Sequence, residues 1–179
     1  MAREHAAALR GMDLCRALSG AELETIAAIA ETQDIAAGKD LFREGDPGDG
    51  LFLVVSGEID VVKHGSGGER SLARLGAGAI LGEISLLTSE SRSATGRALV
   101  DSRVLRLPVQ RFRALLGDGS AAALKMVAAI AEVLARRLAT MNSKVLELAD
   151  KLDSVGNALP GIKEKELAEL HRTMQVWSF

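Results

Sequence analysis

Between residues 33 and 107 the apolar residues occur in short runs, several of which alternate with polar residues, as in β-strands. The runs are DLFR (40–43), GLFLVVS (50–56), EIDVVK (58–63), RSLARL (70–75), SATGRALV (93–100) and SRVLRL (102–107). Eleven of the eighteen glycines lie from Gly38 to Gly82, and EGDPGDG (44–50) and HGSGGE (64–69) are typical tight turns that need no functional explanation. Many short strands joined by such turns predict a β-sandwich or β-roll.

Helical spacing frames this β region on both sides. Ser19 and Glu22 form a capping-box pattern, which predicts a helix over about residues 20–31 with a shorter helix before it. After residue 108 the pattern is helical again, first in VQRFRALL (109–116) and then in a long run over about residues 120–155 that Gly156 and Pro160 are expected to end. The predicted fold class is mainly β with α: a jelly-roll-like β-roll flanked by N-terminal helices and a long C-terminal helix.

The chain therefore divides into four expected segments. They are an N-terminal helical segment (1–32), a β-roll with a short internal helix (33–118), a long dimerisation helix (119–155) and a short helical tail (156–179).

The long helix carries an apolar stripe whose members are three or four residues apart, the spacing of a coiled-coil seam. The stripe consists of Leu124, Val127, Ala131, Leu134, Leu138, Met141, Val145, Leu148, Leu152 and Val155. For its first half, packing on the β-roll and packing on a second copy are equal alternatives. For Met141 to Val155 we favour a second copy, because this part extends farther than a small roll can readily cover, and we expect a parallel homodimer through residues 134–155.

Composition narrows the functional classes. The net charge is −2 and the chain has four Phe, one Trp and no Tyr, so neither a basic nucleic-acid footprint nor an aromatic stacking platform is expected. Cys15 is the only cysteine, which fits a reducing compartment. The sequence contains no run of eighteen apolar residues, which a membrane span would need, and the N-terminus does not resemble a signal peptide. A cytoplasmic location is therefore expected.

The sequence offers little sign of catalysis or metal binding. His5, His64 and His171 are scattered through terminus, turn and tail, so we interpret them as surface residues and expect no metal site. No nucleophile elbow or triad motif is present, and we predict that the protein is not an enzyme.

Candidate chemistry is concentrated in GEISLLTSESRSAT (82–95), which places a carboxylate and a guanidinium nine residues apart among small and apolar residues. Gly82 ends a strand, and the following EISLL predicts a one-turn helix whose first amides can bind an anion such as phosphate. Arg92 can donate a forked pair of hydrogen bonds to phosphate oxygens, and Ser93 adds a hydroxyl. Glu83 suits a sugar hydroxyl instead, so the pair together describes a ribose phosphate. The alternative is an internal ion pair between Glu83 and Arg92.

These residues resemble the phosphate-binding cassette of the cyclic-nucleotide-binding domains found in catabolite activator proteins, kinase regulatory subunits and nucleotide-gated channels. The resemblance covers roughly residues 15–150 and includes the glycine pattern of AGKDLFREGDPGDGLFLVVSGEIDVV. It implies that Glu83 binds the ribose 2′-hydroxyl and Arg92 the cyclic phosphate. The other implied ligand contacts are Gly82, Ile84, Ser85, Ser93 and Ala94 in the cassette, and Val61, Leu72 and Leu81 as apolar lining.

The same resemblance suggests a ligand and an output. Met141 and Asn142 stand where the activator's dimer helix has two hydroxyl residues that contact adenine, and the Asn142 amide complements the N6 and N7 edge of adenine. Because Ser93 is compatible with cyclic GMP as well, we predict cyclic AMP with cyclic GMP as a possible ligand.

Only 24 residues follow Val155, too few for a winged helix-turn-helix, so we expect a cyclic AMP sensor that signals to an unidentified protein effector. The alternatives are a reduced or truncated transcription regulator and an interaction module with an unoccupied pocket.

Overall fold

The computed structural model describes residues 2–65, 67–88 and 90–158, with side chains described as far as Leu152. The chain forms two compact units, residues 1–130 and residues 131–179. Residues 159–179 of the predicted tail, which include Trp177 and His171, lie outside the described residues.

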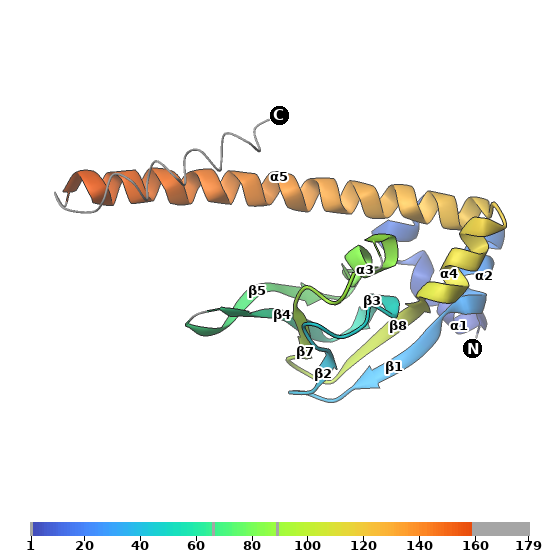
Figure 1. The fold of residues 1–179 in the computed structure, drawn as a ribbon. Helices are drawn as coiled ribbons and strands as arrows, with labels where there is room; N and C mark the ends of the chain where they lie inside the picture. Colours follow the sequence, from blue (N-terminus) through green and yellow to red (C-terminus); the bar gives the residue numbers. More distant parts are fainter. Residues whose placement is uncertain (1, 66, 89, 159–179) are drawn as a thin grey trace. The chain divides into compact units, whose positions relative to one another are not determined.

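Three short helical elements open the first unit (Figure 1). They are α1 (Ala2–Arg10), the 3₁₀ helix η1 (Asp13–Cys15) and α2 (Gly20–Ile29). The predicted capping box at the start of α2 is confirmed: the Ser19 amide donates to the Glu22 carboxylate at 2.7 Å, and the Glu22 amide donates to the Ser19 hydroxyl at 3.3 Å. The helix ends two residues earlier than expected, because Glu31 already belongs to the first strand.

Two four-stranded antiparallel sheets form the body of this unit (Figure 1). One sheet has the order β1 (Glu31–Ile35), β8 (Ser102–Pro108), β3 (Gly50–Ser56) and β6 (Ile80–Leu81). The other has the order β2 (Asp40–Phe42), β7 (Thr95–Ala98), β4 (Glu58–Gly65) and β5 (Gly68–Gly76). The predicted β-roll with flanking helices is confirmed. Its core contains Ile35, Leu41, Phe52, Val54, Ile59, Leu81, Ala98 and Val104.

The apolar runs did not reveal β1, and β6 was expected only as the strand that ends at Gly82. β1 has the sequence ETQDI and contributes one fully buried residue, so hydrophobic alternation is nearly absent from it. Cross-strand charge pairs to β8 accompany it instead: Arg103 donates to Asp34 at 2.6 Å, and Arg106 donates to Glu31 at 2.8 Å. β6 has only two residues, which is too short for any periodicity to register.

Helix α4 (Val109–Gly117) follows β8 directly, and α5 (Ala121–Ala158) comes next. α5 runs past Gly156, where the sequence suggested a stop. Glycine weakens a helix by about 1 kcal/mol relative to alanine but leaves its hydrogen bonds possible, so it does not by itself end one.

Within the first unit, α5 does not use the predicted stripe. Its buried residues are Ala122, Ala123, Met126 and Ile130, whereas Leu124 is 55% exposed. The interpretation in which the first half of the stripe packs on its own β-roll is therefore wrong for Leu124. The reason is that a second apolar face, offset by one or two positions from the stripe, is the buried one.

His5 corrects another expectation, because it is buried rather than on the surface. Its Nδ1 lies 3.3 Å from the Ala27 carbonyl oxygen, and its Nε2 lies 2.9 Å from the Thr32 hydroxyl. The ring thus links α1 to α2 and β1. His64 is exposed on β4, as expected.

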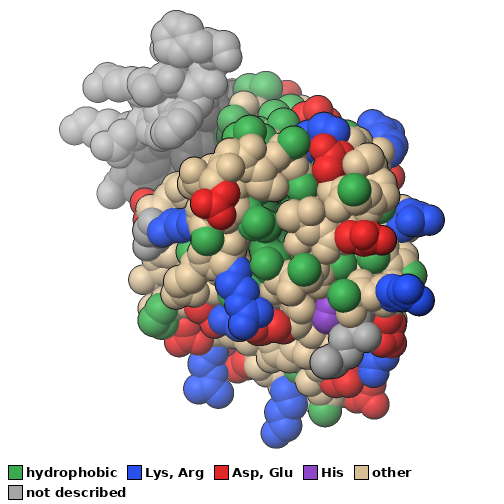
Figure 2. All heavy atoms as spheres, turned by 90° about the vertical axis from the view of Figure 1, so that its right-hand side faces the viewer, with side chains coloured by type: hydrophobic (Ala, Val, Ile, Leu, Met, Phe, Trp, Pro, Cys, Tyr) green, Lys and Arg blue, Asp and Glu red, His purple; other side chains and the backbone are tan. Residues whose placement is uncertain are grey.

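The surface carries charges of both signs, in agreement with the small net charge. On the face shown in Figure 2, acidic and basic side chains are interspersed with small hydrophobic areas.

Among the described helices, none is by itself long and apolar enough to cross a bilayer. Taken together as a pair bent by 116°, α4 and α5 have the length and composition of a broken span.

Candidate functional site

The predicted cassette connects the two sheets. It leaves β6 at Leu81, turns at Gly82, forms α3 (Glu83–Thr88) and enters β7 at Thr95. Gly82 has φ +82°, a region that residues with a Cβ rarely adopt. A Cβ there would also overlap Arg92 Nη1 and lie 2.9 Å from the Gly50 carbonyl oxygen. Residue 82 is therefore glycine both for its backbone conformation and for the close approach of Arg92.

Arg92 is the most buried charge of the cassette, with 3% of its surface exposed. Its Nη2 donates to Asp49 Oδ1 and to the Gly50 carbonyl, both at 2.8 Å, and its Nη1 donates to the Gly82 carbonyl at 3.4 Å. Its Nε is buried without a hydrogen-bond partner. Burial is the main cause that lowers the pKa of Arg92, and the bond to Asp49 acts in the opposite direction.

Two aromatic rings complete the surroundings of this guanidinium. Its central carbon lies 4.4 Å from the ring centroid of Phe42 and 5.1 Å from that of Phe52. The two rings stack on each other with centroids 5.6 Å apart. Cation–π attraction of this kind contributes more where the cation is desolvated, so the rings partly replace the water that Arg92 has lost.

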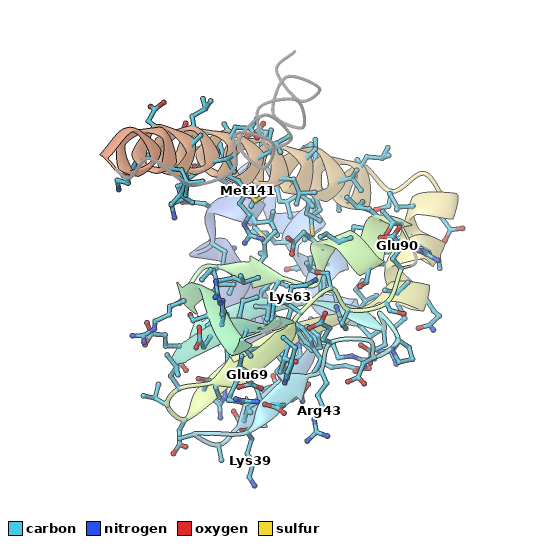
Figure 3. All side chains as sticks on the ribbon, turned by 60° about the vertical axis from the view of Figure 1, so that its left-hand side comes forward. Lys39, Arg43, Lys63, Glu69, Glu90 and Met141 are labelled. Atoms are coloured by element: carbon cyan, nitrogen blue, oxygen red, sulfur yellow. The ribbon has the colours of Figure 1, made fainter. Side chains whose placement is uncertain are left out.

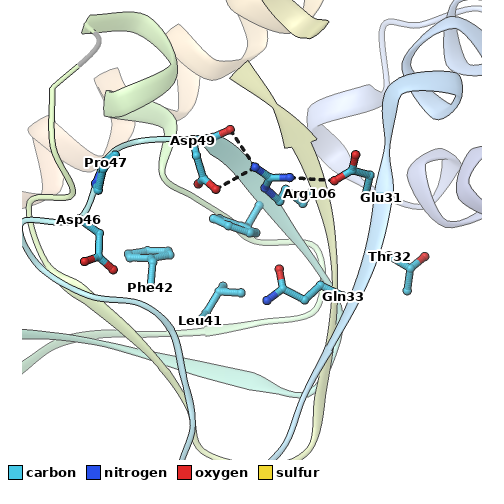
Figure 4. Close-up of a pocket in the computed structure, with 10 residues that line it drawn as sticks. Glu31, Thr32, Gln33, Leu41, Phe42, Asp46, Pro47, Asp49 and Arg106 are labelled. Atoms are coloured by element: carbon cyan, nitrogen blue, oxygen red, sulfur yellow. Dashed lines mark hydrogen bonds and ion pairs between the residues drawn. The ribbon is translucent and has the colours of Figure 1, made fainter. Parts of the chain in front are cut away.

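Arg92 forms an ion pair with Asp49, a residue that the sequence did not suggest as its partner. Asp49 also accepts a hydrogen bond from Arg106 at 2.8 Å, and Arg106 in turn pairs with Glu31 (Figure 4). Asp49 belongs to the turn between β2 and β3, which sequence reasoning treated as purely structural. The signal that could have found it is a carboxylate at the end of a turn, directly before a buried strand.

The same turn is hydrogen-bonded to the cassette through its backbone. The Arg92 amide donates to the Asp46 carbonyl, and the Gly45 amide donates to the Arg92 carbonyl, both at 2.9 Å. At Gly48 a Cβ would overlap the side chain of Ser85 on α3. Gly48 was also absent from the predicted set, and its role here is to let α3 lie against the turn.

The remaining predicted residues occupy different environments. Glu83, Ser85, Ala94 and Leu81 are buried, and Leu81 belongs to the core cluster of the roll. Val61 is partly buried on β4, opposite Gly96 of β7 and Ala73 of β5. Ile84 is 37% exposed, Leu72 on β5 is 59% exposed and Ser93 is exposed. Asn142 is exposed and belongs to the second unit.

A cleft of about 680 Å³ lies on the other side of the turn (Figure 4). It is lined by Glu31, Thr32, Gln33, Leu41, Phe42, Asp46, Pro47, Asp49, Phe52 and Arg106. None of the predicted site residues lines this cleft, although it shares Asp49 and both aromatic rings with the surroundings of Arg92. Within the described part of the chain, no group of three His, Cys, Asp or Glu side chains could hold a metal ion.

Comparison with known proteins gives the family. Residues 32–118 match the model of the cyclic nucleotide-binding domain. The chain is 32% identical over 166 residues to the cyclic AMP receptor protein of Thermus thermophilus, spanning 90% of this chain and 74% of that protein. This chain belongs to the cyclic nucleotide-binding domain family. The resemblance seen in its cassette is thereby confirmed.

Other members of the family match over different shares of their length. A cAMP-dependent protein kinase regulatory subunit of Colletotrichum orbiculare is 35% identical over 109 residues, which is 61% of this chain and 27% of that protein. Among solved structures, a cyclic nucleotide-binding domain from Methylobacillus flagellatus is 26% identical with a TM-score of 0.72, covering 82% of this chain and 83% of the other. The chain is a cyclic nucleotide-binding regulatory domain related to cyclic AMP receptor proteins and to kinase regulatory subunits.

The close approach at residue 82 can be tested by a matched pair of glycine substitutions. Gly82→Ala and Gly78→Ala both place a Cβ at positive φ, with φ +82° and +86°, but only residue 82 lies against Arg92, since nothing lies within 4 Å of a Cβ at residue 78. We expect Gly78→Ala to lower the free energy of unfolding by about 1–2 kcal/mol and Gly82→Ala to lower it further. Urea denaturation measures both. Equal losses would contradict the role assigned to the contact with Arg92.

Proposed function

We propose that this domain is a sensor of 3′,5′-cyclic AMP that binds the nucleotide at the cassette and signals through its C-terminal helix to a protein partner. The observation that carries the proposal is Arg92, a nearly buried guanidinium whose Nε lacks a partner. A buried donor without a partner costs about 1–3 kcal/mol, and a phosphate oxygen is a strong acceptor for it. A purely structural arginine would have no need of that vacancy.

The other roles follow the family resemblance. Glu83, buried at the first position of α3, is proposed to accept from the ribose 2′-hydroxyl. Gly82, Ser85, Ser93 and Ala94 are proposed to surround the phosphate, and Val61 and Leu72 to lie against the base and sugar. Relatives named for cyclic AMP among both receptor proteins and kinase regulatory subunits support cyclic AMP as the ligand. Cyclic GMP is the second candidate.

The proposed output is a population shift. The nucleotide binds one placement of the C-terminal helix better than others and thereby stabilises it. The apolar stripe of that helix supports a homodimer, because its members from Leu138 to Leu152 are between 39% and 61% exposed. They are Leu138, Met141, Val145, Leu148 and Leu152. A reduced or truncated transcription regulator is the alternative, which the similarity to a protein of Mycobacterium tuberculosis named as a CRP-like cAMP-activated global transcriptional regulator favours.

The first test removes the arginine. Arg92→Ala is expected to weaken cyclic AMP binding about ten- to a hundredfold, because a charge-assisted hydrogen bond to phosphate is lost. Isothermal titration calorimetry measures the affinity. Since Arg92 also packs against two rings, Arg92→Lys serves as a second variant that keeps the charge but not the fork. Arg103→Ala, which removes an exposed ion pair on β8, is the control. Unchanged affinity in both Arg92 variants would overturn the assignment of the cassette.

The second test concerns the homodimer. Leu148→Asp is expected to give a monomer at tens of micromolar, because it places a charge in the predicted seam. Leu146→Asp is the matched control, since Leu146 is about equally exposed but does not belong to the stripe. Light scattering gives the mass. A parent protein that is monomeric with and without nucleotide would refute the dimer.

The third test concerns base selectivity. Asn142→Ala is expected to reduce the preference for cyclic AMP over cyclic GMP, because the amide offers both a donor and an acceptor to adenine. Ser143→Ala is the control, since the Ser143 hydroxyl already donates to the Ala139 carbonyl within the helix. Titration of both nucleotides into each variant decides it. Unchanged selectivity would assign base recognition to other residues.

A further inference from the structure

Lys63 is a second cation beside the cassette. It lies on β4, and its side chain is 48% exposed (Figure 3). Its ammonium donates to the Ser93 carbonyl at 2.8 Å and lies 3.5 Å from Glu44 Oε1. Because Ser93 directly follows Arg92, Lys63 brings a second positive side chain into contact with the cassette. The sequence motif did not single out Lys63.

The strand register brings the lysine to this position. Side chains alternate along β4, so Lys63 and Val61 share a face with Ile59 of the core cluster, while Val62 lies on the opposite face. Val61 and Val62 are paired with Gly96 and Thr95 of β7, so β4 runs alongside the end of the cassette. Lys63 thus lies on the same face as Val61 of the proposed apolar lining, two residues further along β4 toward Ser93.

The hydrogen bonds that Arg92 makes with the protein leave it few N–H donors for a phosphate. Both Nη2 contacts are made with the protein, to Asp49 and Gly50, and Nη1 faces the Gly82 carbonyl. A cyclic phosphate has two exocyclic oxygens that share one negative charge. Arg92 has five N–H donors and uses three of them in these contacts, so only Nε–H and one Nη1–H remain for a ligand, and a donor on β4 would add to these two.

The present partners of Lys63 are easily replaced. One is a neutral carbonyl oxygen, and the other is a carboxylate at a distance longer than a hydrogen bond, in a half-exposed setting where ion pairs contribute about 0–1 kcal/mol. A phosphate oxygen that carries part of a charge is a better acceptor than the carbonyl.

We infer that Lys63 is a second phosphate-binding residue, which moves from the Ser93 carbonyl to one exocyclic phosphate oxygen while Arg92 serves the other. This inference rests on the proposed function and specifies how the site distinguishes its anionic ligand. One cation on β4 and one in the cassette, between α3 and β7, would each recognise one of the two oxygens. The site would then discriminate between the two exocyclic oxygens of the phosphate.

Lys63→Met tests this assignment, because methionine keeps an unbranched stem and removes the charge. We expect it to weaken cyclic AMP binding about tenfold and to reduce the dependence of affinity on salt concentration. Lys63→Arg should retain most of the affinity. Lys39→Met is the matched control, since Lys39 is exposed in the turn before β2 and is labelled well away from Lys63 in Figure 3.

A merely structural role is separated by the two phosphorothioate diastereomers of cyclic AMP, in which sulfur replaces one exocyclic oxygen or the other. The parent should prefer one diastereomer, and Lys63→Met should reduce that preference. If Lys63 only fastened β4 to the cassette, both diastereomers would weaken equally, and the inference would be wrong. It would also be wrong if Lys63→Met bound like the parent. A parent that binds no cyclic nucleotide would overturn the proposed function itself.

Discussion

The first unit is organised around the cost of burying one positive charge. Removing an arginine from water is unfavourable unless anions, dipoles or aromatic rings replace the lost hydration. Arg92 obtains an anion from Asp49, carbonyl dipoles from Gly50 and Gly82, and two ring faces from Phe42 and Phe52. These groups come from β2, β3, the turn between them and the cassette. The buried charge thus ties together both sheets and the segment that connects them.

Close packing near this charge explains why small residues are placed where they are. Gly82 leaves space for the guanidinium, and Gly48 leaves space for Ser85. Either position would clash if it carried a side chain, so the turn and α3 can approach only because both residues lack one. The turn between β2 and β3 is therefore as much a part of the site as the cassette is, although only the cassette has the recognisable motif.

Local patterns were sufficient to predict the strands with apolar residues, the capping box at Ser19 and the cassette, because each leaves its signal within a few adjacent residues. β1 could not be predicted in this way, since its partner charges Arg103 and Arg106 lie about seventy residues further along the chain. Asp49 was missed for the same reason: its importance comes from Arg92, which is distant in sequence. On α5, two apolar faces overlap, and periodicity alone did not tell which one, Leu124 or Met126, would be buried.

Asp49 is shared between two arginines, and this has a consequence for how the sequence can vary. One carboxylate oxygen accepts from Arg92 and the other from Arg106, and Arg106 also pairs with Glu31, which in turn pairs with Arg111 of α4. Substitutions along this series will not act independently, because losing one arginine leaves the carboxylate more available to the other. Positions 92 and 106 are therefore expected to be epistatic: the residue tolerated at one depends on the residue present at the other. A lineage that loses Arg106 alters the setting of the cassette arginine without changing the cassette motif.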